Sequence, residues 1–240
     1  MSKIVLVTRP EPGAAATADM LTRLGHVPLL APMLTITARV LSTAAGPTAA
    51  GPATHPPVQA VLITSANAIA SMAAFDRALP VLAVGDATAA RATQAGFARV
   101  TSAGRDAAAL TALACAVCRP GAGPLLLPTG AGLGLDLARA LRRHGFTVHR
   151  RVAYSARPAT TLPPDAAVAL GTGRIDAALF FSAASARAFL GCMSKQEGQV
   201  DRIEALAISH PTARALAPLP WRRIRVASHP NQDELVALLS

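Results

Sequence analysis

Short runs of β-branched or leucine-rich residues alternate along the chain with longer, helix-like segments, and turns containing Ser, Thr, Gly or Pro separate them. Strands that alternate with helices form a parallel sheet with helices covering its faces. The pattern therefore predicts an α/β fold. The runs expected to form strands are Ile4–Val7, Val61–Ile63, Val81–Val84, Leu125–Leu127, Ala178–Phe181, Leu206–Ile208 and Ile224–Ala227.

These strand and helix units recur in similar pairs, each with a strand that runs into a helix start. The paired segments are 62–68 with 179–185, 83–91 with 207–214, and 5–27 with 126–146. Matching units at separate places in one chain indicate an internal duplication. We therefore expect two similar lobes, each a parallel, flavodoxin-like sheet flanked by helices.

The order of the paired units predicts that one lobe is inserted into the other. Lobe 1 would be discontinuous and consist of residues 1–35 and 158–240, and lobe 2 would consist of residues 36–157. The chain must then cross between lobes twice, and we expect two linker strands at about 33–39 and 152–157. Residues 42–57 are rich in Gly, Pro, Ala and Thr without a hydrophobic period, which indicates a mobile loop.

The net charge of +10 indicates an acidic partner, and it depends on arginine because Lys3 and Lys195 are the only lysines. A polyanionic metabolite, nucleic acid, or an arginine-rich composition with solvated charges would each explain it. The arginines are scattered and aromatic residues make up 3% of the chain, which argues against nucleic acid.

Several features favour a cytoplasmic protein that does not enter a membrane. No apolar run approaches the roughly 20 residues that cross a bilayer, and the first residues do not resemble a secretion signal. Cys115, Cys118 and Cys192 are an odd number of cysteines, as is typical of a reducing compartment. Because Cys115 and Cys118 have no partner pair at zinc spacing, we expect ordinary core or surface thiols.

Polar residues follow the predicted strands at the positions where a ligand would bind. Ligands of open α/β sheets bind outside the carboxyl ends of the strands, where helix starts present free N–H groups. Facing lobes would offer many such donors, which suits carboxylates. Helix capping, worth about 1 kcal/mol, explains any one of these residues equally well, so the functional interpretation depends on their repetition. The residues are Thr64, Ser65, Asp86, Thr88, Ser182, Ser209 and Thr212.

Motifs for cofactor and metal chemistry are absent from the sequence. The run Gly130–Gly134 fails the dinucleotide pattern because Leu135 stands where the last glycine is required. The sequence has no phosphate loop and no G-x-S-x-G, and the six histidines lack metal-ligand spacing. We therefore expect no cofactor and no metal. The segment 128–134 is expected to form a turn that faces the ligand. A functional role for His210 stays open.

Several short segments keep a specific order and spacing along the whole chain: Leu6–Pro10, Ile63–Ala68, Val84–Ala89, Val152–Tyr154, Phe180–Ser182 and Ala207–Ala213. In these segments the chain resembles the uroporphyrinogen-III synthase family of tetrapyrrole biosynthesis. The resemblance implies a cofactor-free lyase that closes hydroxymethylbilane into uroporphyrinogen III, inverting ring D and releasing water. It also implies that main-chain amides hold the carboxylates of the substrate.

The resemblance also implies roles for particular residues. Tyr154, the only tyrosine, would assist departure of the leaving hydroxyl, although a packing role is the alternative. Two segments depart from the family pattern: Ser209-His210-Pro211 replaces a Gly-Pro or Gly-Lys, and Pro128-Thr129-Gly130 replaces an Arg-Gly-Glu type of turn. The residues expected to bind the substrate are Arg9, Thr64, Ser65, Asn67, Gly85, Thr88, Ser182, Ser209 and Thr212.

A second function remains open at this stage, namely a two-lobe receptor or sensor that closes on an acidic metabolite without chemistry, because fold alone does not determine function. For the enzyme, we expect a monomer that receives hydroxymethylbilane from hydroxymethylbilane synthase and that binds neither nucleic acid nor membrane.

Overall fold

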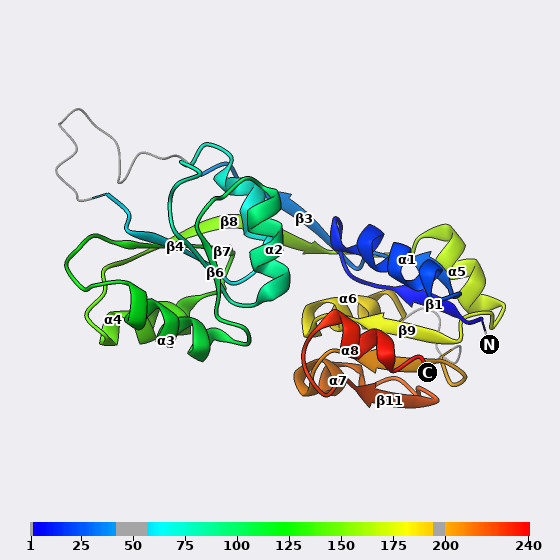
Figure 1. Cartoon of the computed structure of the whole chain (residues 1–240). Helices are drawn as coiled ribbons and strands as arrows, with labels where there is room; N and C mark the ends of the chain where they lie inside the picture. The colour runs from blue at the N-terminus through cyan, green and yellow to red at the C-terminus, as the bar shows by residue number, and fades with distance from the viewer. Residues whose placement is uncertain (1, 42–56, 194–199) are drawn as a thin grey trace. The chain divides into compact units, whose positions relative to one another are not determined.

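The computed structural model describes residues 2–41, 57–193 and 200–240. Contacts divide the chain into unit 1, Met1–Ile36 with Arg157–Ser240, and unit 2, Thr37–Ala156. The loop predicted at 42–57 lies outside the described residues except for Pro57. Each unit is built around its own sheet, and the elements are labelled in Figure 1.

Unit 1 contains a five-stranded sheet in the order β11-β10-β9-β1-β2, with every neighbouring pair parallel. Its strands are β1 (Ile4–Val7), β2 (Val27–Leu30), β9 (Ala177–Phe180), β10 (Glu204–Ala207) and β11 (Arg223–Val226). Its helices are α1 (Gly13–Arg23), α5 (Pro164–Gly171), α6 (Ala183–Met193), α7 (His210–Leu216) and α8 (Gln232–Ala237).

Both faces of this sheet are covered, which explains why its central strands are continuously apolar. Along β1, Val5 and Val7 pack in the cluster formed with α1 and α8, whereas Leu6 packs in the cluster formed with α5, α6 and α7. This alternation follows from the period of two in a strand. Burying a side chain of this size stabilises the fold by about 1.5–3 kcal/mol.

Unit 2 contains a six-stranded sheet in the order β3-β8-β7-β4-β5-β6. Its strands are β3 (Leu34–Ala38), β4 (Ala60–Ile63), β5 (Val81–Ala83), β6 (Val100–Ser102), β7 (Leu125–Gly130) and β8 (Val148–Pro158). Its helices are the 3-10 helix η1 (Ala66–Met72), α2 (Asp86–Gln94), α3 (Ala107–Val117) and α4 (Leu135–Arg143).

The strands β3 and β8 carry the chain from one unit to the other and lie side by side. The Arg39 N–H donates to the Ala153 carbonyl at 2.7 Å, and the Ala159 N–H donates to the Met33 carbonyl at 2.9 Å. Met33 pairs with Ala159 and Arg39 pairs with Ala153, so residue numbers increase in opposite directions along the two strands and the strands are antiparallel. The other neighbouring pairs in unit 2 are parallel.

The two sheets share one strand order. In unit 1, β11, β10, β9, β1 and β2 follow one another, and in unit 2 the same succession is β6, β5, β4, β7 and β8. The helix after β9 corresponds to η1 after β4, and α7 after β10 corresponds to α2 after β5. The predicted α/β fold of parallel sheets flanked by helices is therefore confirmed, and the paired sequence segments occupy equivalent places.

Candidate functional site

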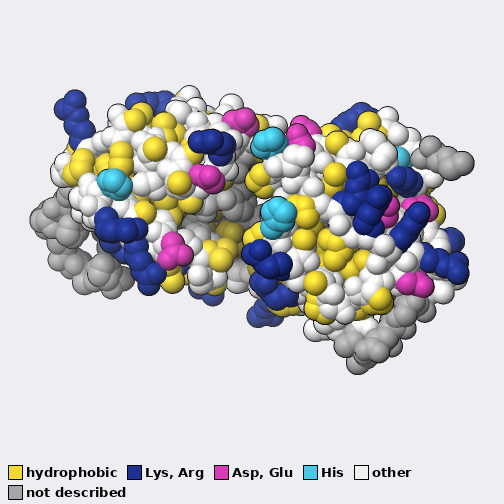
Figure 2. All heavy atoms as spheres, turned by 90° about the horizontal axis from the view of Figure 1, so that it is seen from below, with side chains coloured by type: hydrophobic (Ala, Val, Ile, Leu, Met, Phe, Trp, Pro, Cys, Tyr) yellow, Lys and Arg dark blue, Asp and Glu magenta, His cyan; other side chains and the backbone are white. Residues whose placement is uncertain are grey.

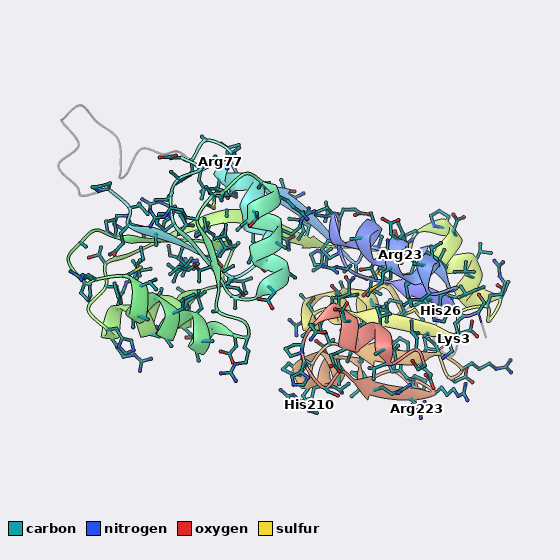
Figure 3. All side chains as sticks on the ribbon, in the orientation of Figure 1. Lys3, Arg23, His26, Arg77, His210 and Arg223 are labelled. Carbon is teal, nitrogen blue, oxygen red and sulfur yellow. The ribbon has the colours of Figure 1, made fainter. Side chains whose placement is uncertain are left out.

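The amino ends and the carboxyl ends of the strands in the unit 1 sheet carry different chemical groups. At the amino ends of the strands, charged groups have partners within the unit: the Ile4 N–H donates to the Asp176 carboxylate at 2.7 Å, and Arg223 pairs with Glu204 at 2.6 Å. Figure 3 shows Lys3 and His26 near the amino ends of the strands and His210 toward the other end of the unit. The carboxyl ends carry hydroxyl groups and helix starts instead, as a ligand site of this fold class requires.

In unit 1, two helix starts carry paired hydroxyl groups. Ser182 follows β9, accepts a bond from the Ser185 N–H at 3.0 Å, and lies 3.0 Å from the Ser185 hydroxyl. Ser209 follows β10 and its hydroxyl lies 3.0 Å from that of Thr212. Ser185 and Thr212 are each 1% exposed, so they form the buried half of each pair. Ser182 and Ser209 are half-buried, and they form the accessible half.

Arg9 lies just beyond the carboxyl end of β1, beside the strand β9. Its guanidinium lies over the Phe181 ring, 4.3 Å from the centroid. Its Nη1 donates to the side-chain oxygen of Gln232 at 2.7 Å and to the Thr17 hydroxyl at 3.2 Å. A Cβ added to Gly13 would lie 2.4 Å from Nε of Arg9. These four neighbours hold the guanidinium beyond the carboxyl end of β1, which pairs with β9.

In unit 2, the corresponding helix starts follow β4 and β5. Ser65 caps η1 by accepting the Asn67 N–H at 3.3 Å, and Thr64 and Asn67 are half-buried beside it. The other start is Gly85, which has no side chain to cap α2 and leaves the capping position to its backbone. Thr88, three residues on, is half-buried. Because β4 and β5 are adjacent, these residues lie on neighbouring strand ends.

Tyr154 lies on β8 with 6% of its surface exposed. Its ring packs against Gly130, where an added Cβ would lie 2.9 Å from Cε2 and Cζ of the ring. The Ala131 N–H donates to its carbonyl at 3.1 Å. No hydrogen bond joins the phenol oxygen to another described residue, and this oxygen is not among the fully buried, unpartnered atoms of the described residues, so part of it reaches solvent.

Near the carboxyl end of β7 lies the one buried side-chain oxygen or nitrogen of the described residues that lacks a hydrogen bond, the Thr129 hydroxyl. It lies 3.1 Å from where a Cβ of Gly134 would be, and Gly134 has a positive φ of 77° that favours glycine. Arg150 on β8 donates to the Leu133 carbonyl at 3.1 Å and so reaches the same turn. The segment predicted as a turn at 128–134 therefore begins inside β7, which runs to Gly130, and Gly130 packs against Tyr154.

The cysteines are free thiols, with Cys115 exposed and the other two buried. Burial raises the pKa of the Cys118 thiol and neighbouring Cys115 raises it further, while burial alone raises the pKa of Cys192. These two thiols therefore stay protonated and unreactive at neutral pH. Within residues 2–41, 57–193 and 200–240, no group of His, Cys, Asp or Glu could hold a metal ion. No helix of the same ranges is long and apolar enough to span a membrane.

Positive charge is concentrated in unit 2, which has eleven arginines against four aspartates. Among its described residues, only Arg139 has a carboxylate partner, Asp136 at 3.0 Å on the exposed surface. On the face drawn in Figure 2, the Lys and Arg side chains form several separate groups and no single continuous stripe. Positive charge attracts anions generally, and the face drawn shows no basic stripe of the kind that nucleic-acid surfaces carry.

Sequence reasoning did not identify three residues that hold or shape the site: Gln232, Gly13 and Thr129. Gly13 lies four residues after Arg9 at the start of a helix, a local signal that could have been noticed. Gln232 is 223 residues from Arg9, so only the sheet order brings them together. The missing partner of Thr129 depends on side-chain packing, which no sequence pattern records.

Comparison with solved structures supports the fold. A uroporphyrinogen-III synthetase from Helicobacter pylori matches with a TM-score of 0.60 and 18% identity over 100% of this chain and 98% of that one. A mutant uroporphyrinogen III synthase from the extremely thermophilic bacterium Thermus thermophilus matches with a TM-score of 0.52 and 20% identity over 99% and 96%. No curated protein matches the chain by sequence.

A comparison with protein-family models gives the relationship directly. The model of uroporphyrinogen-III synthase HemD matches residues 15–237, a range that includes nearly all of both units. The chain therefore belongs to the uroporphyrinogen-III synthase HemD family.

Proposed function

We propose that this chain is a uroporphyrinogen-III synthase, which closes hydroxymethylbilane into uroporphyrinogen III with inversion of ring D and loss of water. The observation that carries the proposal is the family match over residues 15–237. The function is an enzymatic one, a cyclising lyase of tetrapyrrole biosynthesis. No feature of the described residues favours the alternative of a receptor that binds without chemistry.

The chemistry needs little from protein side chains. The hydroxyl group on ring A leaves with a proton as water, and an electrophilic azafulvene remains. The substituted carbon of ring D attacks it, and a spiro intermediate rearranges before the ring loses a proton. The free substrate cyclises unaided without the inversion, so the protein must orient ring D and assist the leaving group.

We propose Tyr154 as the general acid for the leaving hydroxyl. A phenol carries an O–H that can donate to a departing hydroxyl group, as a general acid requires. Two observations support the role: the phenol oxygen makes no hydrogen bond within the described residues, and Gly130 leaves the space in which the ring packs. The ring is thus held rigidly while its proton is not engaged elsewhere.

We propose that the carboxylates of the substrate bind at the carboxyl ends of the strands in each unit. The residues assigned to this role are Arg9, Thr64, Ser65, Asn67, Gly85, Thr88, Ser182, Ser209 and Thr212. The side chains of Ser65 and Ser182 also cap helices, so they have a structural role in addition to any contact with the ligand. In Thr212 the hydroxyl is buried, so we assign its contact to the backbone N–H at the helix start.

We further propose that the protein acts in the cytoplasm as a monomer, without a cofactor, and receives its unstable substrate from hydroxymethylbilane synthase. The three free cysteines are in keeping with a reducing compartment. A rate per molecule that is constant over a wide range of protein concentration would agree with a monomer, and a rate that rises on concentration would contradict it.

The test is to mix purified protein with enzymatically generated hydroxymethylbilane, oxidise the products, and separate the uroporphyrin isomers. The proposal predicts that type III exceeds the type I formed spontaneously, in proportion to the protein added. A receptor without catalysis would bind the substrate and leave the isomer ratio at its spontaneous value, which would overturn the proposal.

A further inference from the structure

We propose that Gln232 is a positioning residue, which together with Gly13 fixes the guanidinium of Arg9 so that it binds a carboxylate of the substrate. The inference rests on the proposed function and assigns a role to two residues from outside the polar strand ends. The contact joins the start of α8 to the carboxyl end of β1 across 223 residues of sequence.

The Gln232 side chain can act only as an acceptor toward Arg9, because a guanidinium has donors and no acceptor. This fixes the amide orientation, with the oxygen 2.7 Å from Nη1 of Arg9 and 3.1 Å from the Thr17 hydroxyl. The amide nitrogen lies 3.2 Å from the sulfur of Met20. Thr17 itself is fully buried on α1 and accepts from Arg9 at 3.2 Å.

The flat faces of the guanidinium are also constrained. Phe181 contributes a ring 4.3 Å away. At Gly13, an added Cβ would lie 2.4–2.5 Å from Nε, Cζ and Nη2 of Arg9, a separation that atoms do not tolerate. The φ of Gly13 is not in the left-handed region, so its lack of a side chain is explained by Arg9 and not by backbone conformation.

A fixed guanidinium binds a carboxylate more tightly than a mobile one, because less rotamer freedom is lost on binding. Because Gln232 is neutral, its bond does not cancel the positive charge of Arg9, whereas a glutamate at 232 would pair with it. The position is the carboxyl end of the central strand β1, beside the Ser182 helix start, where a ligand of this fold class binds.

A purely structural role, in which Gln232 ties α8 to α1, makes different predictions, and kinetics separate the two. The experiment measures KM and kcat for type III formation in Gln232→Met, Arg9→Met and the double variant, with unfolding monitored by circular dichroism. Methionine is close to glutamine in length but cannot accept the bond. Gln94→Met is the matched control, since Gln94 accepts from Arg91 at 3.4 Å on an exposed surface.

The expected result is that Gln232→Met raises KM about tenfold and leaves kcat within about twofold of the parent. Arg9→Met should raise KM at least as much, and the double variant should match Arg9→Met, because both changes act through one guanidinium. Gln94→Met should leave both constants unchanged.

Gly13→Ala provides a second route that does not touch Gln232. Alanine is a better helix former than glycine, so the helix is retained while the added methyl displaces the guanidinium. It should raise KM by a similar factor, about tenfold.

Parent values of KM in both Gln232→Met and Gly13→Ala, or a double variant in which the two effects multiply in full, would overturn the inference. Parent protein that forms no excess of type III isomer would instead overturn the proposed function, and with it the substrate on which the inference depends.

Discussion

At the scale of single residues, two serines at strand ends act through bonds to their neighbours in sequence. Ser65 and Ser182 follow predicted strands, and both cap the next helix by accepting an N–H two or three residues on. Capping depends on neighbours in sequence, so it can be predicted from sequence. The packing of Tyr154 on Gly130 and the bond between Arg9 and Gln232 depend on the tertiary fold, and no local pattern indicates them.

Replacing Tyr154 by Phe should lower the rate of type III formation by about 10²-fold, as expected for loss of one general acid. Stability should change little, because the phenol oxygen makes no hydrogen bond within the described part of the chain. Initial rates and a urea titration test both statements. A variant with the parent rate would show that Tyr154 is a packing residue.

Replacing Thr129 is expected to make the protein more stable. Its hydroxyl is buried without a partner, and replacement by Val, which has the same shape, should raise the free energy of unfolding by about 1 kcal/mol. Thr212→Val is the matched control, because that hydroxyl lies 3.0 Å from Ser209 and its removal should destabilise the protein by about 1 kcal/mol. Urea unfolding in which both variants lose stability would contradict this account of Thr129.

At the scale of elements, short apolar runs predicted the central strands β1, β9 and β10 of unit 1 and β4, β5 and β7 of unit 2, while other elements were less visible. The strand β6 spans only Val100–Ser102 at a sheet edge, and no predicted strand covered it. After β4, the segment forms a 3-10 helix, Ala66–Met72, where a helix of unspecified type was expected. The register shift opposite Thr129 and Gly130, which face Val152 and Tyr154 of β8, also has no sequence pattern of its own.

Helix α3 begins with an aspartate cap, and its removal tests whether caps stabilise these short helices. Asp106 accepts the Ala109 N–H at 2.9 Å, so Asp106→Ala should lower the free energy of unfolding by about 1 kcal/mol. Asp136→Ala removes an exposed partner of Arg139 and should change it much less. Thermal or urea unfolding of the two variants makes the comparison, and equal losses would argue against a specific capping effect.

At the scale of the whole molecule, the repeat in the sequence anticipated that equivalent strands would occupy equivalent places. Both sheets show the same order of strands, with β1 and β2 of unit 1 in the places of β7 and β8 of unit 2. The repeated segments indicated the shared strand order because similar sequences form similar elements. Two linker strands were expected at about 33–39 and 152–157, and β3 and β8 lie there. That β3 joins the unit 2 sheet as its edge strand was not expected, because sheet membership depends on pairing between residues far apart in sequence.

Unit 2 is contiguous in sequence, whereas unit 1 needs both ends of the chain. A fragment of residues 37–156 should therefore fold cooperatively alone, since it contains its own buried cluster and the strands β4 to β7. A fragment of residues 158–240 lacks β1, the strand that β9 pairs with in the middle of its sheet, and should stay unfolded. Circular dichroism during urea titration tests both, and the reverse result would contradict the division into these units.

The central claim is that substrate carboxylates bind to backbone amides at the carboxyl ends of the strands. The most direct test is an NMR titration of ¹⁵N-labelled protein with uroporphyrinogen III under anaerobic conditions. We predict that the amide signals of Ala66, Ala87 and Ala183, at the starts of η1, α2 and α6, shift with the ligand. The amides of Ile4, Glu204 and Leu125, at the amino ends of strands, should stay in place. Shifts confined to the amino ends, with Ala66, Ala87 and Ala183 unmoved, would contradict the claim.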